Sequence, residues 1–199
     1  IDALKVLKKS INKNFDKAVN TIVNCQSKII LCGVGKSGLI AAKIASTLSS
    51  VGSPAFSLSA NDCLHGDLGS ITRKDILILI SNSGKSEEII PIIKFANRNK
   101  IKLIGIVSKK NSFLYKGSDI KILLPEVKES GLGVVPTSST SIQLAIGDAL
   151  AVAALKKKQF SKYDFSRLHP GGNLGKQLKT VGDIMATGIK VPFINENKS

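Results

Sequence analysis

Apolar and polar positions along the chain form blocks that predict strands and helices in turn. Five short segments are continuously or mainly apolar, as strands are: "KIILC" at 28–32, "PAFSLS" at 54–59, "ILILIS" at 76–81, "KLIGIVS" at 102–108 and "IKILL" at 120–124. Most are unbroken rather than alternating, which is typical of strands buried on both faces of a sheet.

Between these strands, apolar residues recur at helical spacing. Residues 1–26 are predicted to form one helix, and further helices are predicted over 37–51, 86–100 and 140–158. The apolar positions of the first helix are Leu4, Leu7, Ile11, Phe15, Val19 and Ile22. Strands alternating with helices favour an α/β fold, a three-layer αβα sandwich around a mainly parallel five-stranded sheet.

Three small-residue loops carry the candidate chemistry. "GVGKSG" (33–38) and "SNSGKS" (81–86) follow predicted strands, and "PTSSTS" (136–141) begins the long helix. The carboxyl ends of parallel strands share one edge of the sheet, where helix N-termini present N–H groups that favour a phosphate. We therefore expect an anion site there, although Ser and Thr also occur as plain helix caps.

Two nucleotide-binding patterns are alternatives for the Gly-Lys-Ser loops. A Walker A loop needs a Gly five positions before the Gly of "GKS", but Ile30 and Leu79 occupy those positions. "GVGKSG" does satisfy the dinucleotide pattern, with Asp62 downstream as a ribose-binding acid. The second loop lacks the glycines of that pattern, so a dinucleotide is the weaker alternative.

Charge and composition limit the kinds of binding partner that the sequence predicts. The 199 residues carry a formal charge of +15, mostly from dispersed Lys, with no Trp and no nucleic-acid-binding motif. A small anionic substrate is therefore expected, rather than nucleic acid. The longest apolar run, 149–155, is too short for a membrane span, so no membrane partner is expected. Three Cys, an odd number without metal-binding spacing, favour a reduced cytoplasmic setting.

A set of motifs resembles a known family. "GVGKSG", "HGDLG", "ISNSGKSEE", "PTSST", "GDALAVA" and "HPGGNLG", in this order, resemble the sugar isomerase (SIS) superfamily and, within it, the D-arabinose 5-phosphate isomerases. The resemblance covers residues 1–180, and "VGDIMATG" resembles the entry to a pair of CBS domains. It implies a SIS domain over 1–180 and a linker over 181–199 into a CBS pair beyond this chain. The missing initiator Met also suggests a piece of a longer protein.

The resemblance implies an aldose–ketose isomerase that interconverts D-ribulose 5-phosphate and D-arabinose 5-phosphate through an enediolate, for Kdo and lipopolysaccharide synthesis. No cofactor is implied. The implied catalytic residues are Lys36, Glu88, Glu129 and His169. Glu129 is expected to be the base and His169 to open the sugar ring or relay a proton. Lys36 is expected to neutralise the phosphate or an enediolate oxygen.

The resemblance also implies a set of substrate-binding positions, most of them hydroxyls on the three loops. They are Ser37, Gly52, Ser53, His65, Ser81, Asn82, Ser83, Ser86, Thr137, Ser138, Ser139 and Thr140. Two departures matter. Ser59 stands where some members have a candidate zinc-binding His, so Cys63 and His65 form a poor zinc site and no metal is expected. Lys85 replaces a Glu common in relatives, which makes its loop more positive.

SIS domains usually form dimers or tetramers, so a homo-oligomer, for example a homotetramer, is expected, with the first and the long helix as contact faces. Two other functions remain open: a phosphosugar sensor without catalysis, and an isomerase of another phosphosugar such as a hexulose phosphate. The intact set of four catalytic candidates speaks against a sensor, and "HGDLG" with "HPGG" speaks against the other isomerase.

Overall fold

The computed structural model describes residues 1–171 and 181–191. The chain forms two compact units, Ile1–Phe160 and Ser161–Ser199. The division falls before the predicted domain boundary at residue 180.

The first unit is built on five parallel strands in the order β2-β1-β3-β4-β5. Their bounds are Ile29–Gly33 (β1), Ala55–Ser59 (β2), Ile76–Ser81 (β3), Lys102–Val107 (β4) and Ile120–Leu123 (β5). Every residue of β1 and β3 is buried, as their continuous Ile and Leu content predicts. The predicted strands and their parallel pairing are confirmed.

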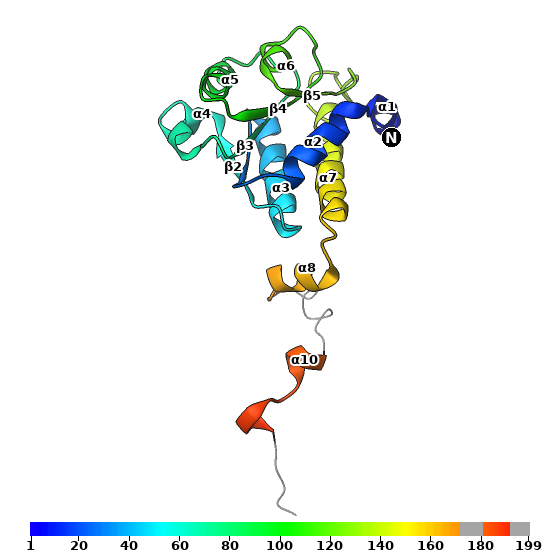
Figure 1. Ribbon diagram of the computed structural model, residues 1–199. Coiled ribbons are helices and arrows are strands. Elements are labelled where there is room, and N and C mark those ends of the chain that lie inside the picture. Colours follow the sequence, from blue (N-terminus) through cyan, green and yellow to red (C-terminus); the bar gives the residue numbers. More distant parts are fainter. Residues whose placement is uncertain (172–180, 192–199) are drawn as a thin grey trace, which may run out of the picture. The chain divides into compact units, whose positions relative to one another are not determined.

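Helices cover both faces of this sheet (Figure 1). One face packs against α1 (Asp2–Ser10), α2 (Lys13–Val23), α3 (Lys36–Ser50) and α7 (Ser138–Lys157). The other packs against α4 (Ala60–Cys63), α5 (Ile89–Arg98) and α6 (Phe113–Gly117), with the 3-10 helix η1 (Asp67–Ser70) close to α4. Alternate residues of β1, β3 and β4 enter the two cores: Ile29 and Leu31 of β1 face α3 and α7, whereas Ile30 and Cys32 face α5. The three-layer sandwich is thereby confirmed.

The prediction of one helix over residues 1–26 is wrong. The chain leaves the helical conformation at Ile11, where α1 ends, and α2 begins after Asn12. The side chain of Asn12 accepts a hydrogen bond from the Asn14 N–H at 2.9 Å and so caps α2. Asn favours such local bonds over a helix interior, and the apolar spacing runs through the break without revealing it.

The second unit contains α8 (Lys162–Leu168), α10 (Val181–Ile184) and the 3-10 helix η2 (Gly188–Lys190). Apolar spacing did not predict α8, but its start carries a capping box between Ser161 and Asp164. The sequence also predicts a loop over 169–178 that leads into a short helix. That loop lies outside the described residues beyond Gly171, and α10 is the helix that follows it.

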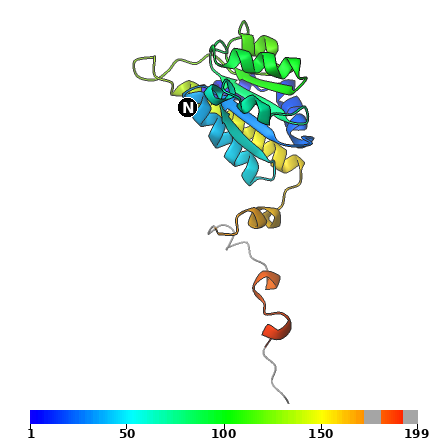
Figure 2. The same ribbon diagram turned by 90° about the vertical axis from the view of Figure 1, so that its left-hand side faces the viewer.

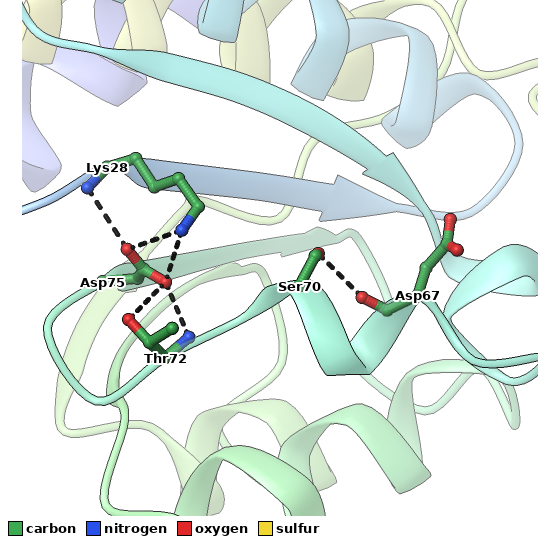
Figure 3. Close-up of polar contacts among 5 residues, drawn as sticks. All are labelled: Lys28, Asp67, Ser70, Thr72 and Asp75. Carbon is green, nitrogen blue, oxygen red and sulfur yellow. Dashed lines mark hydrogen bonds and ion pairs between the residues drawn. The ribbon is translucent and has the colours of Figure 1, made fainter.

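A buried carboxylate organises the amino-terminal edge of the sheet, where β1 and β3 begin (Figure 3). Asp75 accepts hydrogen bonds from the Lys28 N–H, the Lys28 ammonium, and the N–H and hydroxyl of Thr72. Burial by itself would raise the pKa of Asp75, but hydrogen bonds from Ser27, Thr72 and Lys28 outweigh it and lower the pKa to about 2. Asp75 therefore ties the starts of the two central strands together as an ionised group.

Candidate phosphate site

The candidate site lies at the opposite, carboxyl-terminal edge of the sheet. β1 and β3 are neighbours in the sheet, but the chain continues from β1 to β2 toward one end of the strand order and from β3 to β4 toward the other. The loops that follow β1 and β3 therefore lead away from each other at this edge, as at the ligand sites of other open parallel sheets. Gly33 ends β1, and a Cβ at this position would lie 2.8 Å from the Ser37 carbonyl carbon and 2.9 Å from the Ile80 oxygen. Glycine is therefore required for the first turn of α3 to close onto the sheet.

The loop after β1 presents the N-terminus of α3. Gly35 adopts φ +57° at its N-cap and no side chain caps the helix. Lys36 is exposed at the first helical position, and Ser37 is half-buried beside it. The Ser37 hydroxyl donates a hydrogen bond of 3.1 Å to Gln143 Oε1 on α7. The structure thus places a cation and a hydroxyl at an uncapped helix N-terminus, which is suited to an anion.

The loop after β3 is held in shape by its own polar groups. Ser81 Oγ accepts a hydrogen bond from the Gly84 N–H at 3.0 Å, and Ser108 Oγ donates one of 2.7 Å to Asn82 Oδ1. Asn82 and Ser83 are exposed, and Ser86 is half-buried. Glu88 is half-buried at the N-cap of α5, without a side-chain capping bond. Since the backbone bends are fixed internally, the loop is largely pre-formed for a ligand.

The N-terminus of α7 is already occupied by a carboxylate. Glu129 Oε2 accepts hydrogen bonds from the N–H of Thr137 (2.8 Å), the hydroxyl of Thr137 (3.1 Å) and the N–H of Ser139 (3.2 Å). Burial would raise the pKa of Glu129, but the bonds from Ser139 and Thr137 outweigh it and lower the pKa to about 2. Glu129 is ionised at neutral pH, but in this position it is a weak base.

The remaining hydroxyls of this helix start lie beside that carboxylate. The Thr140 hydroxyl donates a hydrogen bond of 2.9 Å to the Thr137 carbonyl, Ser138 is half-buried, and Ser139 is buried. The exposed segment before them, residues 131–136, projects from the body of the unit (Figure 2).

A pocket of about 620 Å³ adjoins the loop after β3. Its lining includes Ser83, Lys85, Lys109, Lys110 and Asn111, and it is floored by Leu124. Lys109 forms an ion pair with Glu126 on its rim. Lys85 therefore adds positive charge to the wall of this pocket, which is large enough for a small anionic ligand.

The structure does not bring Gly52 and Ser53 to this edge. Both follow α3 and precede β2, so they lie at the amino-terminal edge of the sheet. The Lys158 ammonium donates hydrogen bonds to the Gly52 carbonyl (3.0 Å) and the Ser53 hydroxyl (2.8 Å), and Ser53 is buried. Within one chain these residues join the ends of α3 and α7, and their predicted substrate contact stays a prediction.

The two histidines lie in different units. His65 is exposed in the turn after α4, close after the carboxyl end of β2, and Ser59 caps α4 by accepting the Asp62 N–H. His169 belongs to the second unit, where its ring stacks on Phe165 with centroids 3.8 Å apart. His169 Nδ1 lies 2.8 Å from the Phe165 carbonyl oxygen. A carbonyl only accepts, so Nδ1 carries the proton and Nε2 of the neutral ring is left as an acceptor.

Sequence reasoning missed Gln143, the partner of Ser37. The signal was present: position 143 falls on the helical face that also contains Ser139, Ile142, Ile146 and Leu150, all buried in the structure. A polar residue on a buried face needs a partner.

Among the described residues, α7 is the one helix long and apolar enough to cross a membrane, and its apolar residues form part of the core.

These features define a class of protein: a parallel α/β domain whose carboxyl edge carries hydroxyl-rich loops and exposed lysines at the starts of its helices. Comparison with known families identifies the family within this class. The SIS domain family matches residues 22–153, and the chain belongs to this family.

Individual relatives agree. The chain is 43% identical over its whole length to the arabinose 5-phosphate isomerase KdsD of Yersinia pestis and spans 61% of that protein's length. An E. coli CFT073 protein solved in complex with arabinose 5-phosphate superposes with a TM-score of 0.79 at 35% identity, covering 84% of this chain and 92% of that one. A putative sugar-phosphate isomerase from Listeria monocytogenes superposes with a TM-score of 0.81 at 30% identity, covering 85% and 91%.

Proposed function

We propose that this chain is the isomerase domain of a D-arabinose 5-phosphate isomerase, which interconverts D-ribulose 5-phosphate and D-arabinose 5-phosphate for Kdo and lipopolysaccharide synthesis in the cytoplasm. One observation carries the proposal. The uncapped start of α3, the pre-formed loop after β3 and the start of α7, which now binds the Glu129 carboxylate, lie at one sheet edge, in a chain 43% identical to a KdsD. Helix N-termini of this kind suit a phosphate far better than a neutral ligand.

In this proposal the phosphate binds to Ser37, Ser81, Ser83 and Ser86, with Lys36 neutralising its charge or an enediolate oxygen. Asn82 and His65 lie at the same edge as further substrate contacts. The isomerisation moves a proton between C1 and C2, so it needs a base at C2 and a donor for the oxygens, and it needs no hydride.

Glu129 is the proposed base, and its observed contacts set a condition on that role. A carboxylate with a pKa of about 2 removes a carbon-bound proton poorly. A substrate phosphate that takes the N–H groups of Thr137 and Ser139 would release Glu129 and raise its pKa toward the ordinary value. Substrate binding would then activate its own base.

His169 is the proposed ring-opening or relay residue, because the bond from Nδ1 to Phe165 leaves Nε2 able to accept a proton. Glu88, at the N-cap of α5, is the fourth proposed catalytic residue. We further propose a homo-oligomer, a dimer or tetramer. Leu4 and Val6 on α1 and Val152 on α7 are more than 40% exposed, as apolar contact faces of an assembly would be.

NMR of the purified chain with D-arabinose 5-phosphate in deuterium oxide tests the proposal. We expect ribulose 5-phosphate to form and the recovered aldose to carry deuterium at C2. Binding of the sugar phosphate without turnover would instead identify a sensor, and turnover of a hexulose phosphate alone would identify a different isomerase.

A further inference from the structure

Gln143 on α7 is a polar side chain with no solvent exposure. Its Oε1 accepts the hydrogen bond from the Ser37 hydroxyl, whereas its Nε2 has no partner. Within residues 1–171 and 181–191, Nε2 is the one buried side-chain nitrogen or oxygen left without a hydrogen bond. A buried amide donor in this state is costly to the fold.

Folding alone does not account for a glutamine here. Its neighbours on the buried face of α7 include Ile142, Ile146 and Leu150, so an apolar side chain of similar volume would suit the position and remove the unpaired donor. A residue that costs stability in the ligand-free protein is expected to gain its partner in another state.

The position of Gln143 indicates that state. Ser37 lies in the first turn of α3, at the uncapped N-terminus where the proposed phosphate binds. A serine hydroxyl has one proton, and in the ligand-free structure that proton is directed to Gln143. While it is so directed, Ser37 cannot donate to a phosphate oxygen.

We propose that Gln143 is a positioning residue that sets the direction of the Ser37 hydroxyl, and this rests on the proposed phosphate site. When an oxyanion occupies the N-terminus of α3, the Gln143 amide turns over. Nε2 then donates to Ser37 Oγ, and the Ser37 proton is donated to the anion. The turn breaks the bond to Oε1 and moves the unpaired position from the Nε2 donor to the Oε1 acceptor, so the gain on anion binding is the new bond from the Ser37 hydroxyl to the anion.

The substitution Gln143→Met separates this role from a structural one. Methionine has similar volume but neither donates nor accepts strongly, so we expect the midpoint of thermal unfolding to stay level or rise. Isothermal titration calorimetry should show affinity for both inorganic phosphate and D-arabinose 5-phosphate lowered about tenfold. The kcat should change much less than KM. Gln26→Met, an exposed position at the opposite sheet edge, is the matched control and should change neither the unfolding midpoint nor the affinity for phosphate.

A double-mutant cycle gives the sharper test. If Gln143 acts through Ser37, then Ser37→Ala and Gln143→Met each weaken phosphate binding, and the double variant is no weaker than the worse single variant. Gln143→Glu, which accepts only and adds negative charge, should weaken binding further. Additive losses in the cycle, or wild-type phosphate affinity in Gln143→Met, would overturn the proposal, as would a lower unfolding midpoint that accounts for the loss.

The failure of this proposal is distinguishable from failure of the proposed function. Phosphate binding that depends on Gln143, in a chain that does not turn over D-arabinose 5-phosphate, would support the positioning role and reject the isomerase. A wild-type chain that binds neither inorganic phosphate nor the sugar phosphate would overturn both.

Discussion

Two carboxylates at opposite edges of the same sheet have similar pKa values and different surroundings. Asp75, at the amino-terminal edge, has a side chain with no exposure and is bonded to Lys28 and Thr72 (Figure 3). Glu129, at the carboxyl-terminal edge, is half-buried and bonded to the start of α7. Both pKa values are about 2.

The two carboxylates differ in whether a ligand could compete for their hydrogen-bond donors. Asp75 has a side chain with no solvent exposure and is bonded to the half-buried Lys28 and to Thr72, so its contacts serve stability. Glu129 holds helix N-terminal N–H groups that a phosphate also binds. A low pKa alone therefore does not distinguish a structural carboxylate from a catalytic one; access to a competing anion does.

The largest expected effect comes from Glu129→Gln. Removing the proposed base should lower kcat at least about a hundredfold, because general base catalysis typically contributes 10²–10⁴-fold. The free energy of unfolding should fall by only about 1 kcal/mol, since the amide oxygen still caps α7. Steady-state kinetics and urea unfolding measure the two. Glu126→Gln, in the same loop and paired with Lys109, is the control; wild-type kcat in Glu129→Gln would refute the base assignment.

Asp75→Asn should show the reverse pattern. Breaking a buried ion pair by removing one partner should lower the free energy of unfolding by about 3 kcal/mol, with kcat of the folded protein nearly unchanged. Asp2→Asn removes an exposed pair with Lys5 and should cost under about 0.5 kcal/mol. Equal losses in the two variants, by urea unfolding, would show that burial does not strengthen the Asp75 pair.

Acid should narrow the stability difference between wild type and Asp75→Asn. The pKa of Asp75 is lower in the folded state than its ordinary value of 3.8, so its contribution is complete above about pH 4 and is lost as the pH falls toward 2. Unfolding measured at pH 6, 4, 3 and 2 should show the gap narrowing by about 2 kcal/mol over this range. A gap independent of pH would mean that the ionised form of Asp75 is not what stabilises the fold.

The smallest of these effects is expected at the loop after β3. Ser83→Ala should raise KM about fivefold, roughly 1 kcal/mol, with little change in kcat, because the hydroxyl is proposed to contact the phosphate in ground and transition states alike. Ser50→Ala removes a half-buried hydroxyl at the end of α3 and serves as the control. An unchanged KM for Ser83→Ala would exclude its hydroxyl from the phosphate site.

Much of this molecule is determined locally in the sequence. The apolar runs at 76–81 and 102–108 form strands, and small-residue loops lead into α3, α5 and α7, because side-chain periodicity and turn chemistry act over a few residues. The parallel order then brings the loops after β1 and β3 to one edge. The local pattern was insufficient at residues 11–12, where the cap formed by Asn12 interrupts an unbroken apolar spacing.

Only the tertiary structure decided which polar groups meet. Ser37 and Gln143 are 106 positions apart, and their contact depends on how α7 packs against α3. The same packing places Gly52 and Ser53 beside Lys158 at the far edge of the sheet, and the loop before α7 brings Glu129 to that helix start. Such pairings depend on strand order and helix orientation, which arise from burial of the whole chain and leave no periodic signal in any one segment.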